Sequence, residues 1–145
     1  MEKHYRFSDE VYEQKFRDCK FPPLYFSHEA HLRLAYIHLK KYGLKQSIEN
    51  MCNQIYDFAI KYGATMKFNA TVTFASLNIM YQYMQKSKSE NFQDLMKEFP
   101  LLLQDFKGVI KQHYSGDIFR SSEAKTTILQ PDLEPFEYAA EKIDR

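Results

Sequence analysis

The sequence predicts an all-α fold: a single-domain helical bundle of five or six helices with an up-down core. Apolar residues recur at helical spacing along most of the chain. Capping residues and glycines bracket these apolar segments, and no segment alternates apolar and polar residues as a half-buried strand does. We therefore expect residues 1–145 to form one domain, with a core over about residues 8–129 and an irregular tail over residues 130–145.

Start and stop signals place the helices in chain order. The residues that cap, begin or end them are Ser8, Ser27, Gly43, Gly63, Asn69, Pro100 and Gly116. The predicted helices cover residues 9–19, 28–42, 44–62, 70–85, 92–96 and 100–114. Because Pro22 and Pro23 disfavour helix, residues 20–26 are expected to be an extended connection.

The C-terminal part is expected to be less regular. Ser121 can cap one more short turn. Pro131 and Pro135 then make the tail irregular, and residues 137–145 are either helical or frayed.

The helix over residues 70–85 is apolar nearly all round, which is typical of a helix at the centre of a bundle. Four of its polar residues lie among these apolar ones: Thr71, Thr73, Ser76 and Asn78. We expect these side chains to be buried.

Composition narrows the class of protein. Lysine and arginine number 20 against 19 acidic residues, and the two signs are interleaved, so neither nucleic acid nor a membrane surface is an expected partner. No stretch reaches the roughly 18 apolar residues of a membrane-spanning helix, and residues 1–16 lack the apolar region of an export signal. Cys19 and Cys52 form no CxxC motif, which suits the reducing cytoplasm. The composition leaves the oligomeric state open.

Histidines lie on the apolar faces of two predicted helices. His28, His31 and His38 share the apolar face of the helix over residues 28–42, and His113 lies at the centre of the apolar arc of the last long helix. His38 is about 15 Å from His28 along the helix axis, so we assign it to another layer.

The short connections between helices predict antiparallel neighbours. In an up-down bundle, His28, His31 and His113 would then converge with Asn69 and Thr71 at one end. Convergent neutral imidazoles suit a late first-row transition metal ion such as zinc, iron or copper, and a buried imidazole can also serve as a general base.

Two metal motifs are excluded, and a structural alternative stays open. The chain contains no Glu-x-x-His pair of the di-iron type, and the run from His28 to His31 spaces its histidines three apart, not four as in HExxH. The alternative is that each histidine is a core residue hydrogen-bonded to a carbonyl, a tyrosine or a threonine.

Four segments contain these polar residues in short motifs. Three are continuous: residues 26–32 (FSHEAHL), 68–73 (FNATVT) and 131–135 (PDLEP). The fourth, residues 113–125, contains His113-Tyr114, Ser121 and Ala124-Lys125. Together they resemble a family of small uncharacterised bacterial helical proteins with the pattern F-x-H-x-x-H-L, [HN]-x-T-x-[ST], H-Y and P-D-L-x-P. The resemblance implies no reaction, cofactor or partner. The chain departs from the pattern at Asn69, where many relatives carry histidine, and at Lys125, where arginine is commoner.

The candidate site combines the histidines with the polar residues of these motifs. The catalytic or metal-ligating candidates are His28, His31 and His113. The candidates for substrate binding are Asn69, Thr71, Tyr114, Ser121, Lys125 and Asp132. Four of these also have a structural interpretation: a helix cap for Asn69, a bond within its helix for Thr71, a solvated charge for Lys125 and a turn for Asp132.

Three function classes therefore stay open. The first is a small-molecule enzyme or ligand-binding protein with a histidine-lined pocket. The second is a metal-binding protein, and the third is a helical interaction module without chemistry. A ligand-binding protein requires a concave cavity lined by tyrosines and histidines, whereas a module requires an exposed apolar patch.

Overall fold

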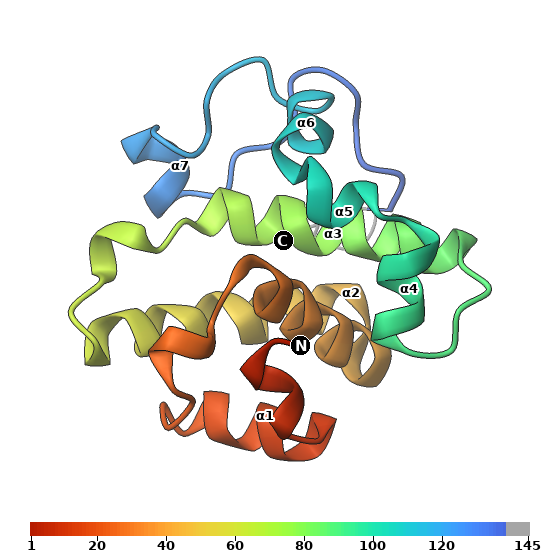
Figure 1. The fold of residues 1–145 in the computed structure, drawn as a ribbon. Helices are drawn as coiled ribbons and strands as arrows, with labels where there is room; N and C mark the ends of the chain where they lie inside the picture. Colours follow the sequence, from red (N-terminus) through yellow and green to blue (C-terminus); the bar gives the residue numbers. More distant parts are fainter. Residues whose placement is uncertain (139–145) are drawn as a thin grey trace. The chain divides into compact units, whose positions relative to one another are not determined.

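A computed structural model describes residues 1–138 (Figure 1). All regular structure in this range is helical, as the sequence predicts. The α-helices are α1 (Asp9–Arg17), α2 (His28–Lys61), α3 (Ala70–Lys86), α4 (Phe92–Glu98), α5 (Leu101–Gln104), α6 (Phe106–Lys111) and α7 (Ser122–Thr126). Three short 3₁₀ segments are η1 (Lys3–Arg6), η2 (Pro23–Tyr25) and η3 (Thr65–Lys67). The seven α-helices of residues 1–138 exceed the expected five or six.

The chain divides into two compact units, Met1–Phe68 and Asn69–Arg145. The first unit contains α1 and α2, and the second contains α3 to α7. The single domain and the up-down order of the helices stay predictions.

In the first unit, aromatic packing joins α1 to α2. Ser8 caps α1 by accepting a hydrogen bond from the Val11 amide, as its sequence position predicts. Tyr12 and Phe16 are fully buried, and the Tyr12 hydroxyl donates to the Ala30 carbonyl of α2 at 2.6 Å. This bond fixes the start of α2 against α1.

The turn in α2 lies at Gly43, where φ is 80° and ψ is 176°. The predicted helices over residues 28–42 and 44–62 meet there, so the predicted boundary is confirmed. A side chain at this positive φ would be strained, and for that reason the position favours glycine.

In the second unit, α3 is the central helix and contacts both α6 and α7 (Figure 1). Its predicted cap is confirmed, because the Asn69 side chain accepts from the Val72 amide. Four of its polar residues are buried as expected: Thr71, Thr73, Ser76 and Asn78.

The predicted helix over residues 100–114 is wrong. The chain breaks at Asp105, whose φ of −150° and ψ of 58° are not helical, and forms α5 before it and α6 after it. The Asp105 carboxylate accepts from the Gly108 amide at 3.1 Å, so it caps α6. A Cβ at Gly108 would clash with that carboxylate, which explains the glycine inside the first turn of α6. His113 consequently follows α6 and is not part of a helix.

The rest of the chain agrees with the expected irregular end. Ser121 caps α7 by accepting from the Ala124 amide, and no helix follows Thr126 within the described residues. Most of the segment 137–145, expected to be helical or frayed, lies outside the described residues. Within residues 1–138, none of the helices combines the length and the apolar character needed to cross a bilayer.

Candidate functional site

His28 and His31 lie in the first turns of α2, after the cap at Ser27. The His28 side chain is exposed, whereas the Nε2 atom of His31 is buried and has no hydrogen-bond partner among residues 1–138. Burial, with a smaller effect of the His28 charge, lowers the pKa of His31 to about 4. The His31 ring therefore stays neutral at physiological pH and packs 5.3 Å from the Phe26 ring.

His113 has a structural partner in the tail. Its Nδ1 atom lies 2.6 Å from the Glu134 carbonyl oxygen, and its ring lies 4.2 Å from the Phe136 ring. Since a carbonyl can only accept a hydrogen bond, Nδ1 carries the proton. The backbone of the tail is also hydrogen-bonded to His113, because the Leu133 amide donates to the His113 carbonyl. His113 thus docks the tail.

Residues 1–138 contain no group of three or more His, Cys, Asp or Glu side chains placed to hold a metal ion. This finding does not support the transition-metal site expected from His28, His31 and His113. The convergence of these three histidines stays a prediction, since two belong to the first unit and one to the second.

The predicted substrate-binding residues Asn69 and Thr71 are committed to bonds within the second unit. Besides capping α3, Asn69 donates from Nδ2 to the Ile118 carbonyl at 2.7 Å. The Thr71 hydroxyl donates to the Thr127 carbonyl at 2.7 Å and accepts from the Leu129 amide at 3.0 Å. Both side chains therefore tie the start of α3 to the segments around α7.

Tyr114 and Asp132 hold the tail against the end of α6. The Tyr114 hydroxyl donates to the Leu129 carbonyl at 2.8 Å, and burial raises the pKa of this tyrosine. Asp132 accepts from both the backbone amide and the hydroxyl of Ser115. These bonds lower the pKa of the Asp132 carboxyl group, so the group is ionised at neutral pH. Lys125 lies half-buried on α7.

Two adjoining hollows open on the second unit, and they share a wall formed by residues 114–118. The basic hollow has a volume of about 640 Å³ and is also lined by Lys107, Ile110, Lys111, Phe119, Arg120 and Leu133. The acidic hollow has a volume of about 400 Å³ and is also lined by Ser121, Leu129, Gln130 and Asp132. Three of the predicted site residues, Tyr114, Ser121 and Asp132, thus line these hollows.

The hollows differ in charge. Three cations and the carboxylate of Asp117 line the basic hollow. Asp117 and Asp132 line the acidic hollow, and none of the residues in the range 1–138 that line it is a cation. Among residues 1–138 no histidine lines either hollow, so the expected combination of tyrosines and histidines is not found there.

Sequence reasoning missed the cations of the basic hollow. Lys107 and Lys111 are four residues apart and lie on one face of α6, a spacing that is usual for a solvated helix surface. Arg120 comes from the loop after Gly116, and the path of that loop brings it to the same hollow. The interleaved charges of the sequence gave no signal for this arrangement.

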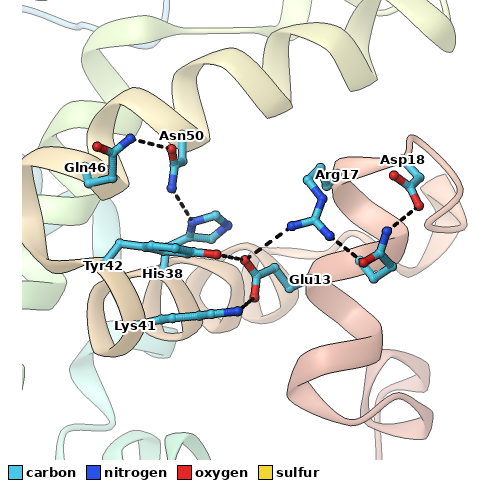
Figure 2. Close-up of polar contacts among 9 residues, drawn as sticks. Glu13, Arg17, Asp18, His38, Lys41, Tyr42, Gln46 and Asn50 are labelled. Carbon is cyan, nitrogen blue, oxygen red and sulfur yellow. Dashed lines mark hydrogen bonds and ion pairs between the residues drawn. The ribbon is translucent and has the colours of Figure 1, made fainter.

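A second missed feature is a polar cluster in the first unit around Glu13 of α1, shown in Figure 2. The buried Glu13 carboxylate accepts hydrogen bonds from Tyr42 and, at 3.1 Å, from Lys41, and Arg17 Nη1 lies 3.9 Å away. Burial by itself raises the pKa of Glu13, but the hydrogen bonds from Tyr42 and Lys41 outweigh it and the pKa is lowered. The carboxylate therefore stays charged inside the unit.

His38, which the sequence assigns to another layer, lies beside this cluster. Its ring is fully buried, and Nδ1 lies 3.4 Å from the Asn50 amide nitrogen across the turn of α2 (Figure 2). Burial lowers the pKa of His38 to about 4, although the Glu13 charge acts in the opposite direction. His38 is thus a neutral core residue.

Comparisons with known proteins give no match. A scan against protein-family models matches none of them, and neither a curated protein nor a solved structure is similar enough to be found. The resemblance of residues 26–135 to a family of small bacterial proteins accordingly stays a prediction.

Proposed function

We propose that the protein binds a small organic anion in the basic hollow. The observation that carries this proposal is the convergence of Lys107, Lys111 and Arg120 on one concave surface. Its volume of about 640 Å³ lies within the range of about 300 to 1,000 Å³ that small-molecule sites occupy.

The chemistry of the lining suits an anion that also carries an apolar part. Ile110, Phe119 and Leu133 supply apolar surface next to the cations. The Lys107 ammonium lies 5.1 Å from the centre of the Phe119 ring, a cation–π contact that restrains the position of its charge.

Arg120 is available to a ligand. Its side chain is 91% exposed, and its nearest acidic partner is Asp117, with Nε and Oδ2 3.9 Å apart. A surface ion pair at this distance contributes little free energy, about 0 to 1 kcal/mol. An anionic ligand can therefore replace Asp117 as the partner of the guanidinium group.

The hollow supports binding better than catalysis. Tyr114 lines the hollow, and its hydroxyl donates its hydrogen to the Leu129 carbonyl. Because burial also raises the pKa of Tyr114, this hydroxyl is a poor acid or base at neutral pH. The remaining charged groups are suited to holding a charge in place.

A titration followed by nuclear magnetic resonance tests the proposal. Ethyl phosphate, added at low ionic strength to uniformly ¹⁵N-labelled protein, is expected to shift the backbone amides of residues 107–120. The double variant Lys107→Gln/Lys111→Gln is expected to bind about fivefold more weakly, since it loses two surface charge contacts. The matched control is Lys45→Gln, an exposed lysine of the first unit.

Two results would overturn this proposal. One is the absence of shifts in residues 107–120 at millimolar ethyl phosphate. The other is an equal affinity for ethyl phosphate in the wild type and the double variant.

A second candidate function rests on His31. Its buried Nε2 atom lacks a partner in the first unit and stays neutral, so it can accept a hydrogen bond from a ligand or coordinate a metal ion together with His28. Elemental analysis of protein purified without an affinity tag tests the metal form of this proposal. A stoichiometric metal that is lost in His31→Ala would support it, and metal-free protein would refute it.

A further inference from the structure

We propose that the natural ligand is a zwitterion whose anionic group occupies the basic hollow and whose cationic group occupies the adjoining acidic hollow. This inference rests on the proposed function. It follows from the opposite charges of two hollows that share one wall.

The shared wall brings the two binding sites within reach of one small molecule. Residues 114–118 face both hollows, so a ligand that crosses this wall passes from the three cations to the carboxylates. Asp117 lies in the wall itself. Its Oδ1 atom accepts from the Phe119 amide at 3.0 Å, which fixes the carboxylate in the loop.

Asp132 is prepared to receive a cation. Its two oxygens accept hydrogen bonds from the amide and the hydroxyl of Ser115, and this arrangement holds the carboxylate in one orientation. A carboxylate has about four acceptor positions, so positions remain for the N–H groups of an ammonium. The Gln130 side chain in the same lining offers a further carbonyl oxygen.

The acidic hollow also determines which anions fit. A ligand with negative charge at both ends would bring one of them close to Asp117 and Asp132, and like charges repel. A ligand with a single anionic end and no amine would leave the acidic hollow unused. The arrangement therefore favours compounds that carry an amine a short distance from a phosphate or carboxylate group.

Three probes of one carbon skeleton test this inference: ethyl phosphate, O-phosphoethanolamine and ethanolamine. The titrations are done at about pH 8, where both phosphates are dianions. O-phosphoethanolamine is expected to bind about fivefold more tightly than ethyl phosphate, because one or two surface charge contacts are added. Ethanolamine alone is expected to bind more weakly than either phosphate.

The variants Asp132→Asn and Asp117→Asn identify the partner of the amine. Asparagine keeps a carbonyl oxygen for the Ser115 or Phe119 amide, and thermal unfolding checks that each variant is folded. Each change is expected to reduce the advantage of O-phosphoethanolamine over ethyl phosphate by at least about twofold. Asp57→Asn, an exposed carboxylate of the first unit, is the control and should leave the advantage intact.

The outcomes separate the inference from the proposed function. If ethyl phosphate binds in the basic hollow and O-phosphoethanolamine binds no tighter, the zwitterion is refuted while the anion site stands. If neither phosphate shifts residues 107–120, the anion site itself fails. A loss of affinity that is equal for both phosphates in the two aspartate variants would also refute the inference.

Discussion

The phenol of Tyr42 donates a hydrogen bond to the buried carboxylate of Glu13, 29 residues earlier in the chain. The two residues belong to α2 and α1, so the bond links the two α-helices of the first unit. Lys41 donates to the same carboxylate and supplies a compensating charge. Through these two hydrogen bonds, Glu13 forms a polar link between α1 and α2.

Tyr42→Phe is expected to destabilise the protein by about 1 to 3 kcal/mol, because a buried charged acceptor loses one of its two donors. The free energy of unfolding in urea measures the effect. Tyr83→Phe is the control: Tyr83 packs edge-on against Phe99, and its change should cost less than about 0.5 kcal/mol. Equal effects at the two tyrosines would show that the bond to Glu13 contributes nothing.

Stability is expected to fall as the pH is lowered from neutral. Burial lowers the pKa values of His31 and His38 from 6.5 to about 4, so the unfolded chain binds protons before the folded protein does. The contribution of each histidine is present above pH 6.5 and is lost between pH 6.5 and 4, by at most about 3 kcal/mol. The free energy of unfolding in urea, measured between pH 7.5 and 5, should depend less steeply on pH in His38→Gln than in the wild type. A slope that is unchanged would contradict the neutral, buried state of His38.

Gly108→Ala is expected to destabilise α6 even though alanine generally favours helix. The added Cβ clashes with the carboxylate of Asp105, so the cap must shift. Asp105→Ala alone should cost about 0.5 to 2 kcal/mol through loss of the cap. In the Asp105→Ala background, Gly108→Ala should become neutral or stabilising, by up to about 1 kcal/mol. The double-mutant cycle would reject the clash if the two effects simply added.

His113→Ala is expected to cost about 1 to 3 kcal/mol, because the Glu134 carbonyl loses the His113 donor and the Phe136 ring loses one of its neighbours. Hydrogen exchange at the Leu133 and Glu134 amides should become faster. Lys45→Ala, at an exposed position, is the control and should stay within about 0.5 kcal/mol of the wild type. A negligible loss at His113 would favour the functional role predicted from the sequence.

The parts of the fold that depend on local chemistry were predictable. Ser8, Ser27, Asn69 and Ser121 cap the helices that the sequence assigns to them, because the cap bond joins residues two or three positions apart. The predicted helix over residues 100–114 failed for a related reason. Asp105 competes for the backbone amides of the next turn, and apolar periodicity does not register such competition.

The candidate site was predictable only in part. Tyr114 and Asp132 came from the short motifs, and both line the hollows of the second unit. Lys107 and Lys111 were missed, since their spacing is equally that of a solvated helix face. Their convergence with Arg120 depends on the loop after α6, whose course is determined by long-range bonds to the tail.

Leu129 and the start of the tail, with Gln130 and Asp132, form one wall of the acidic hollow. That hollow therefore exists only while Tyr114 and Ser115 hold the tail in its docked position. Any molecule that binds there adds its binding free energy to the docked state and withdraws population from undocked ones. Ligand binding in the acidic hollow and docking of residues 129–132 therefore report on the same equilibrium.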